Sequence, residues 1–302
     1  MANMITRSGA EALIDVQVVN EIVQGIVSES MVLKHAKRLP NMTSKQTRLR
    51  VLDSLPLAGF VSGDTGLKQT SSVSWKNKYL NVEEIAVIIP ISEAVLDDAS
   101  YDIWGEIKPR IVEAFGKVID SAVLFGTNKP ASWEDGLVVQ ATTAGNTIPY
   151  VANDTLYARI DKAFAKVEED GFVPNKVLGS VKLKSGFRNM VDSIGQPIKG
   201  TEIDSVAKDF VTNGSWDEDK ADFIVGDFNN LVYAIRQDIT YKVLDQAVIT
   251  NAEGGVELNL AQQDCVALRC VLRLAWSTPN PVNALNPDEG TRYPFAVALP
   301  QA

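Results

Sequence analysis

The sequence predicts a protein of the α+β class, and three observations support this prediction. Strand-like and helix-like patterns intermix along the chain without a regular strand–helix–strand repeat. One long amphipathic helix is expected over residues 103–126, and an alternating strand over residues 265–276. With 302 residues, 45% of them hydrophobic and 22% charged, the chain is also long and apolar enough to bury a large core.

The N-terminal residues 11–37 carry apolar side chains at helical spacing, and Leu39-Pro40 ends the pattern. We expect residues 1–40 to form an amphipathic arm that packs on the body of the chain or on a neighbour. The following stretch is basic and contains no acidic residue. It comprises Lys34, Lys37, Arg38, Lys45, Arg48 and Arg50. These side chains either form a solvated stretch that pairs with acidic neighbours or face a polyanion.

Residues 57–91 are typical of strands on either side of a polar tip. The segment LAGFV leads into SGDTGLKQTSS, and VSWKNKYLNVEEIAVIIPI returns. The returning strand is apolar on both faces around Ile85 to Ile89, so we expect it to be central in its sheet. The tip has almost no apolar residue and cannot bury itself, so the hairpin must project from the body or lie on a partner.

The long helix over 103–126 is predicted from apolar residues that recur every three or four positions. These are Ile107, Ile111, Ala114/Phe115, Val118, Ala122 and Phe125. Gly126, followed by Asn128 and Pro130, gives an orderly end. Pro109 lies near its start, where it either kinks the helix or marks its first turn.

Residues 137–262 mix both kinds of element. A helix is expected over 154–172 with Asp154 as its N-cap, and a second one from Ser180 to Ile194. Residues 223–228 and 231–236 are expected to form a strand pair, and 239–244 another strand. The polar segment 201–222 is predicted to be a loop. The late strand 265–276 places Cys265 and Cys270 on opposite faces, so we interpret both as packing residues.

Composition excludes several classes of function. The formal net charge of −9 disfavours general nucleic-acid binding, and no apolar run is long enough to span a membrane. The N-terminus lacks the apolar region of a signal peptide. The only histidine, His35, lies among basic residues, which favours a solvated or interface residue over a catalytic one. No pattern indicates a metal or cofactor site.

One tripeptide suggests chemistry. Asp64-Thr65-Gly66 spells the signature of aspartic proteases, which hold two aspartates on tight loops that share one proton. Here the signature occurs once, follows Ser62-Gly63 instead of a buried strand, and precedes a polar run. A dimeric aspartic protease acting through Asp64 therefore remains a remote alternative to a hairpin tip.

The order of arm, polar-tipped hairpin, long helix, α+β insert and late strand resembles the major capsid protein of tailed bacteriophages, which has the Hong Kong 97 type of coat fold. Residues 87–138 are similar to the family's return strand, spine helix and following turn, with Asp120 and Gly126 where the family tends to have an acid and a glycine. Residues 223–239 and 265–281 are similar to its Gly-Asp-Phe hairpin and late strand. The resemblance runs from about residue 15 to the C-terminus.

The resemblance implies a phage coat fold made of an N-terminal arm (1–40), an extended hairpin loop (57–84), a peripheral domain (41–56, 85–139 and 263–302) with its spine helix, and an axial domain (140–262). The hairpin would lie across a neighbouring subunit. Its implied contact residues are Gly63, Asp64, Thr65, Gly66, Lys68, Trp75, Lys76 and Lys78.

The resemblance also implies a structural protein without cofactors, which self-assembles as hexamers and pentamers into an icosahedral shell around double-stranded DNA. Implied partners are a portal, a decoration protein, DNA held non-specifically and a separate scaffold protein, because the similar region begins almost at the N-terminus. The implied location is the virion, with assembly in the host bacterial cytoplasm. An encapsulin, a shell of the same fold that encloses a cargo enzyme, is the nearest alternative.

Some relatives join a loop lysine to a neighbour's asparagine. Lys68, Lys76 and Lys78 on the hairpin and Asn280, Asn283 and Asn286 near the C-terminus are the residues that such cross-linking would involve here. Lysines on exposed loops are common, so the sequence does not favour this chemistry.

Overall fold

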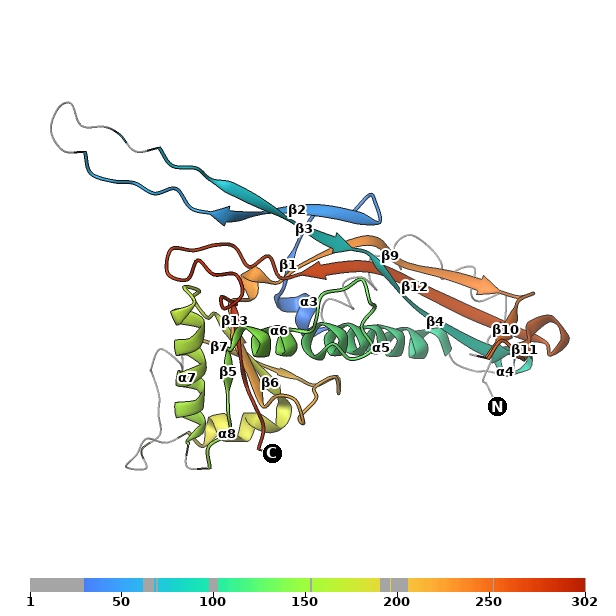
Figure 1. Ribbon diagram of the computed structural model, residues 1–302. Coiled ribbons are helices and arrows are strands. Elements are labelled where there is room, and N and C mark those ends of the chain that lie inside the picture. Colours follow the sequence, from blue (N-terminus) through green and yellow to red (C-terminus); the bar gives the residue numbers. More distant parts are fainter. Residues whose placement is uncertain are drawn as a thin grey trace.

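The structure is a computed structural model that describes residues 30–61, 68, 70–97, 103–152, 154–190, 196, 206–251 and 253–301. Most of the predicted arm, residues 1–29, lies outside the described residues, and so do Gly63 to Gly66 at the hairpin tip. The α+β prediction is confirmed: in the described residues, helices accompany mostly antiparallel strands, which form two larger sheets and two two-stranded ones (Figure 1). The one long helix lies between the two larger sheets (Figure 1).

The first sheet has four strands in the order β1-β9-β12-β4. Their bounds are Lys37–Arg38 for β1, Val232–Leu244 for β9, Cys265–Ser277 for β12 and Glu83–Ser92 for β4. The predicted long helix is α5, Ile103–Phe125, and it lies along one face of this sheet (Figure 1). Gly126 follows it with φ of +68°, a left-handed conformation that glycine adopts at low cost.

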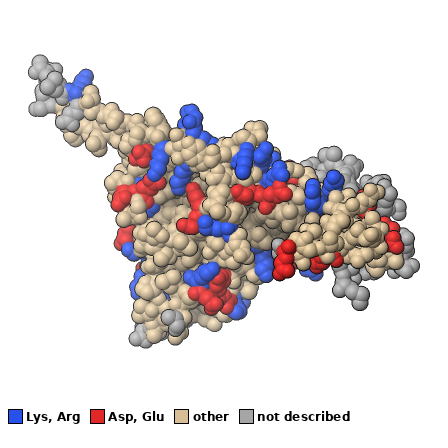
Figure 2. All heavy atoms as spheres, turned by 45° about the vertical axis from the view of Figure 1, so that its right-hand side comes forward, with Lys and Arg blue, Asp and Glu red and all other residues tan. Residues whose placement is uncertain are grey.

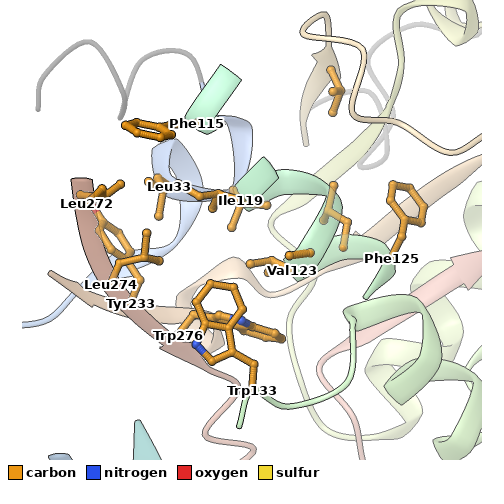
Figure 3. Packing of buried hydrophobic residues seen from close by; sticks show 14 of the residues in the cluster. Leu33, Phe115, Ile119, Val123, Phe125, Trp133, Tyr233, Leu272, Leu274 and Trp276 are labelled. Atoms are coloured by element: carbon orange, nitrogen blue, oxygen red, sulfur yellow. The ribbon is translucent and has the colours of Figure 1, made fainter. Parts of the chain in front are cut away.

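The largest core lies between α5 and this sheet (Figure 3). Ile119 and Val123 of α5 are fully buried, and they face Leu272, Leu274 and Trp276 of β12. The ring of Trp133, from the loop after α5, meets that of Trp276 edge-on at 6.3 Å. Alternation along β12 directs these apolar residues inward and leaves Arg269 on the outer face, as predicted.

The second sheet has five strands in the order β5-β13-β8-β6-β7, and α7, Leu156–Glu169, packs on it. The strands are Thr147–Ile148, Phe295–Ala298, Phe223–Gly226, Lys176–Ser180 and Ala207–Val211 in that order. Smaller elements connect the parts. They are α3 (Met31–His35), α4 (Glu93–Asp97), α6 (Leu137–Ala144), α8 (Lys184–Arg188), β10 (Val248–Thr250), β11 (Val256–Asn259) and the short helices η2 (Val181–Leu183), η3 (Phe228–Asn230) and η4 (Leu260–Gln262).

The sheets correct several strand predictions. Residues 223–228 and 231–236 do not pair, because β8 and β9 belong to different sheets, and 231–236 continues through 239–244 as the single strand β9. The predicted loop 201–222 contains β7, which pairs in parallel with β6. The sheet membership also differs from the predicted division: β9 lies within 140–262 yet joins the first sheet, and β13 lies within 263–302 yet joins the second.

The strand after the hairpin, β4, is an edge strand and not the central one that we predicted. Its alternate residues are exposed, and 43% of Ile88 remains accessible. Apolar residues on both faces of a strand indicate two covered faces, but in the single chain only the face toward α5 is covered.

Two helix predictions also change. The N-cap of α7 is Thr155, whose hydroxyl accepts from the Ala158 amide at 3.2 Å, while Asp154 instead forms an ion pair with Lys162. The second helix is short: Ser180 ends β6, and α8 covers only Lys184–Arg188.

The hairpin consists of β2, Gln46–Ser54, and β3, Ser74–Asn81, paired antiparallel. Pairing therefore begins before residue 57, within residues assigned to 41–56, and residues 57–61 form no strand. Leu80 and Met42 pack at its base against Ala275 of the first sheet, and the rest projects away from the body (Figure 1). None of the helices in the described residues combines the length and apolar character needed to cross a bilayer.

Candidate assembly surface

The hairpin presents a different chemistry on each face. Arg48, Arg50, Trp75 and Tyr79 share the outward face, because Arg48 is opposite Tyr79 and side chains alternate along a strand. Trp75 is 65% exposed and Tyr79 48%. Arginine, tryptophan and tyrosine are the residue types that most often carry the binding energy of protein interfaces. The outward face therefore has the composition of an interface that is uncovered in the single chain.

The inward face ties the hairpin to the C-terminal loop. Lys76 forms an ion pair with Glu289, and this hydrogen bond raises the pKa of Lys76. Lys78 donates to the carbonyl oxygen of Thr278 at 2.6 Å and lies 3.7 Å from Glu134. Two of the predicted contact lysines thus hold the hairpin to its own chain, while Lys68 is exposed.

The three asparagines near the C-terminus already donate within the chain. Asn280 donates to the Arg292 carbonyl at 2.8 Å, Asn283 to the Asp170 carbonyl at 2.6 Å, and Asn286 to the Asp170 carboxylate at 2.8 Å. A cross-link at any of them would have to break such a bond.

Two residues that the sequence reasoning did not single out stand out at the hairpin end. Leu57 is 84% exposed and Phe60 is fully exposed, just before the tip. The only tie of this segment in the described residues is the Leu57 amide, which donates to the Ser71 hydroxyl at 2.7 Å. The sequence did contain a signal for this exposed site, because Leu57 and Phe60 are apolar residues beside a polar tip. We interpreted them as part of a strand.

The basic stretch is divided by the fold. Lys34, on α3, lies 3.6 Å from Asp209, so it has the acidic neighbour that the local sequence lacks. Lys37 and Arg38 form β1, and Lys45 precedes β2. Only Arg48 and Arg50 reach the outward face of the hairpin.

Other basic residues extend that surface. Arg236, Lys242 and Arg269 are exposed on the outer face of the first sheet, and Lys242 is directly opposite Arg269. Like charges directly opposite each other destabilise a sheet, and an acidic group from another molecule would relieve that repulsion. Figure 2 shows basic side chains gathered along this upper side of the molecule.

The described part of the arm meets the body at Asp120, a fully buried carboxylate in α5. Its Oδ1 accepts from the Ser30 hydroxyl at 2.6 Å and the Val32 amide at 3.1 Å. Its Oδ2 accepts from the Met31 amide at 3.1 Å and from Asn213 Nδ2 at 2.7 Å. Burial raises the pKa of Asp120, while these hydrogen bonds oppose that shift.

The prediction for His35 was a solvated or interface residue. The solvated option is wrong, because only 4% of the His35 side chain is exposed in the single chain. Lys176 can only donate, so Nδ1 accepts from it and the ring proton lies on Nε2, 3.1 Å from Asp209. Burial lowers the pKa of His35 to about 4, against the attraction of Asp209. The sequence around His35 shows only basic neighbours. Neither its burial nor its carboxylate partner could be predicted from it, because Asp209 lies on the distant strand β7.

Neither cysteine offers a reactive thiol. Cys265 and Cys270 are buried and free, as packing residues are, and burial raises the pKa of Cys270 to about 12. Among the described residues, no group of three His, Cys, Asp or Glu side chains is placed to hold a metal ion.

These features leave apolar and basic surfaces of the single chain uncovered, which is typical of a structural protein that assembles with other chains. The profile of the phage capsid family matches residues 10–282. The chain therefore belongs to the phage capsid family, and it is a structural shell protein, the major capsid protein of a tailed phage and a part of the virion.

Individual relatives agree. The chain is 28% identical over 259 residues to the major capsid protein of Staphylococcus phage 80alpha, covering 84% of this chain and 78% of that protein. A structure from Microbacterium phage Oxtober96 has 39% identity and a TM-score of 0.80, covering 90% of this chain and 91% of the other. One from Mycobacterium phage Cain has 35% identity and a TM-score of 0.80, covering 90% of each. These relatives do not favour an encapsulin or a protease.

Proposed function

We propose that copies of the chain assemble as hexamers and pentamers into an icosahedral shell that encloses double-stranded DNA, and that the hairpin of one copy lies on the next. The exposure of Leu57 and Phe60 carries this proposal. Each apolar side chain of this size gains about 1.5–3 kcal/mol on burial. A projecting hairpin cannot bury them on its own body, so a neighbouring copy covers them.

In this proposal the parts have distinct roles. The arm (1–40) and the extended hairpin (57–84, with Gly63 to Gly66 at its tip) contact neighbours. Residues 41–56, 85–139 and 263–302 form most of the peripheral domain around α5, to which β9 is added and from which β13 is removed. The rest of residues 140–262 forms most of the axial domain, which meets its copies around the symmetry axes. Contacts that can form at different angles let one chain occupy places that are not strictly equivalent.

The other partners follow from the same reading. A portal, a separate scaffold protein and a decoration protein would contact the shell, DNA would be held without sequence preference, and assembly would take place in the host cytoplasm. The shell needs no catalysis. The basic side chains Arg48 and Arg50 would face either DNA or an acidic neighbour, and the net charge of −9 keeps the remaining surface from holding DNA tightly.

Electron microscopy of the purified chain tests the hairpin contact. Leu57→Ser combined with Phe60→Ser should abolish closed particles and leave small oligomers. Leu285→Ser is a matched control, because Leu285 is 76% exposed on the C-terminal loop. Closed shells from the double variant, in normal yield, would show that the hairpin end is not an assembly contact.

The content of the particles tests the enclosed cargo. We expect nuclease-protected double-stranded DNA in particles made during infection. Particles that instead contain one enzyme in stoichiometric amount, and no DNA, would favour the encapsulin reading.

A further inference from the structure

At the start of the short helix α3, three hydrogen bonds converge on a single side chain of α5. Three successive residues of the arm, Ser30, Met31 and Val32, donate hydrogen bonds of 2.6–3.1 Å to the two oxygens of Asp120. Ser30 is also the N-cap of α3 and accepts from the Leu33 amide at 3.2 Å. The residues where the described arm joins the body are therefore bound to one carboxylate of α5.

That carboxylate depends equally on the arm. Asp120 is fully buried, and a buried carboxylate costs several kcal/mol unless donors replace its water. Among the described residues no lysine or arginine forms an ion pair with Asp120. Its negative charge is therefore stabilised by uncharged hydrogen-bond donors. The fourth donor is Asn213, in the loop after β7. Docking of residues 30–32 and burial of Asp120 thus stabilise each other.

The other end of α3 is held by different groups. His35 lies between Lys176 of β6 and Asp209 of β7, and its ring meets that of Phe228 edge-on at 6.0 Å. Directly afterwards, Lys37 and Arg38 pair with β9. Val32 and Leu33 are buried in the main core and also favour docking. Loss of the Asp120 bonds would therefore weaken the docking of residues 30–33, so that they detach more often, while the chain stays attached from His35 onward.

Releasing α3 would lengthen the arm. The helix has five residues, which span about 7.5 Å as a helix and about 17 Å when extended. The released residues would add about 10 Å of reach, and the first attached residue of the described chain would be His35 instead of Ser30.

We propose that Asp120 is the positioning residue of the arm. Its hydrogen bonds keep α3 docked on the body, and when they break, α3 can detach and lengthen the arm. We call this arrangement the latch. Latched copies and released copies of one chain reach neighbours at different distances, which a closed shell requires. The proposal rests on the proposed shell function, because only in an assembly does the reach of the arm matter.

Native-state proteolysis of the full-length chain tests the latch. Trypsin cleaves after Lys34, in the last turn of α3, and we expect this bond to be protected while α3 is docked. Lys37 and Arg38 stay paired with β9, so cleavage after them is the internal reference. In Asp120→Asn, the amide nitrogen would face the Met31 and Asn213 donors, so we expect cleavage after Lys34 to be about tenfold faster relative to that reference. Ser30→Ala removes only part of the network and should give a smaller increase, which keeps the test valid if Asp120→Asn folds poorly.

Moving the negative charge from position 120 to position 213 should restore protection from trypsin. A merely structural role of Asp120 would not predict this rescue. In Asp120→Asn combined with Asn213→Asp, one negative charge is restored at this site, and the hydrogen bond between positions 120 and 213 forms again with donor and acceptor exchanged. The carboxylate introduced at position 213 can still accept from Ser215, as Asn213 does at 3.1 Å and 2.6 Å. We expect cleavage to return to within about threefold of the wild-type rate. Glu113→Gln, an exposed carboxylate on the same helix, is the matched control and should change nothing.

Particle geometry gives the second readout. Asp120→Asn should produce particles of uneven size by electron microscopy, and the charge-exchanged variant should restore uniform ones. Unchanged cleavage in Asp120→Asn and Ser30→Ala, no rescue, or uniform shells from a fast-cleaving variant would overturn the latch. If the wild-type chain formed no shells, the proposed function would fail instead, whatever the cleavage rates.

Discussion

At the scale of single residues, His35 shows how far local sequence misleads. Its neighbours along the chain are basic, yet its partners in space are Lys176 and the Asp209 carboxylate. A proton on Nδ1 would face the Lys176 ammonium, so the folded chain holds His35 neutral. Asp120 was noted in the sequence for its position on the helix, but its role depends on donors some ninety residues away.

His35 makes stability depend on pH. Its pKa is about 4 in the folded chain and 6.5 in a free side chain, so between these values the unfolded chain binds the extra proton. The free energy of unfolding should therefore fall as the pH drops from about 7 to about 4, by up to about 3 kcal/mol. Urea unfolding at a series of pH values measures this change.

The variant His35→Gln is the control, since glutamine does not titrate. Its stability should be lower at pH 7 and should vary less between pH 7 and pH 4. A pH dependence equal to that of the wild type would exclude His35 as its source.

At the scale of elements, the strongest local patterns were the most reliable. The helix predicted at 103–126 spans Ile103–Phe125, and the strand predicted at 265–276 spans Cys265–Ser277. Both are long, and their periodicity repeats several times. Predictions of short elements were wrong more often. In its described part, the predicted helix Ser180 to Ile194 contains only the three-residue η2 and the five-residue α8, and β7 was missed within a polar segment.

The end of α5 depends on close backbone contact with the start of α6. A Cβ on Gly136 would clash with the Gly126 nitrogen and lie 2.7 Å from the carbonyl carbon of Phe125. Gly136→Ala should therefore lower the free energy of unfolding by about 1–3 kcal/mol. Gly290→Ala is the control, because its nearest neighbouring atom is 3.4 Å away on a side chain. Thermal unfolding compares the two, and equal stabilities would contradict the packing argument.

At the scale of the whole molecule, the surfaces left uncovered in the single chain are more informative about function than the core is. The outward face of the hairpin, the apolar residues before its tip and the outer face of the first sheet are all left open in the single chain (Figures 1 and 2). Five basic side chains lie there, although the chain as a whole is acidic: Arg48, Arg50, Arg236, Lys242 and Arg269. Such segregation of charge favours an acidic partner on that side.

Charge reversal tests this surface. Arg48→Glu combined with Arg50→Glu should reduce the yield of DNA-filled particles severalfold, because two cationic contacts become repulsive. Lys184→Glu combined with Arg188→Glu makes the same change in charge on α8 and should have a smaller effect. Particle counts and nuclease-protected DNA measure the outcome. Unchanged counts and DNA content in the first variant would show that Arg48 and Arg50 face neither DNA nor a neighbour.

The sequence by itself determined the class of fold, the long helix, the late strand, the existence of a projecting hairpin and the resemblance to phage coat proteins. Each of these follows from local periodicity, composition or the order of parts, which do not depend on distant contacts. Only the tertiary structure decided that β9 joins β12, that β4 is an edge strand, that His35 is buried and that Asp120 binds the arm. These depend on which distant segments meet, because periodicity reports that a face is buried but not what covers it.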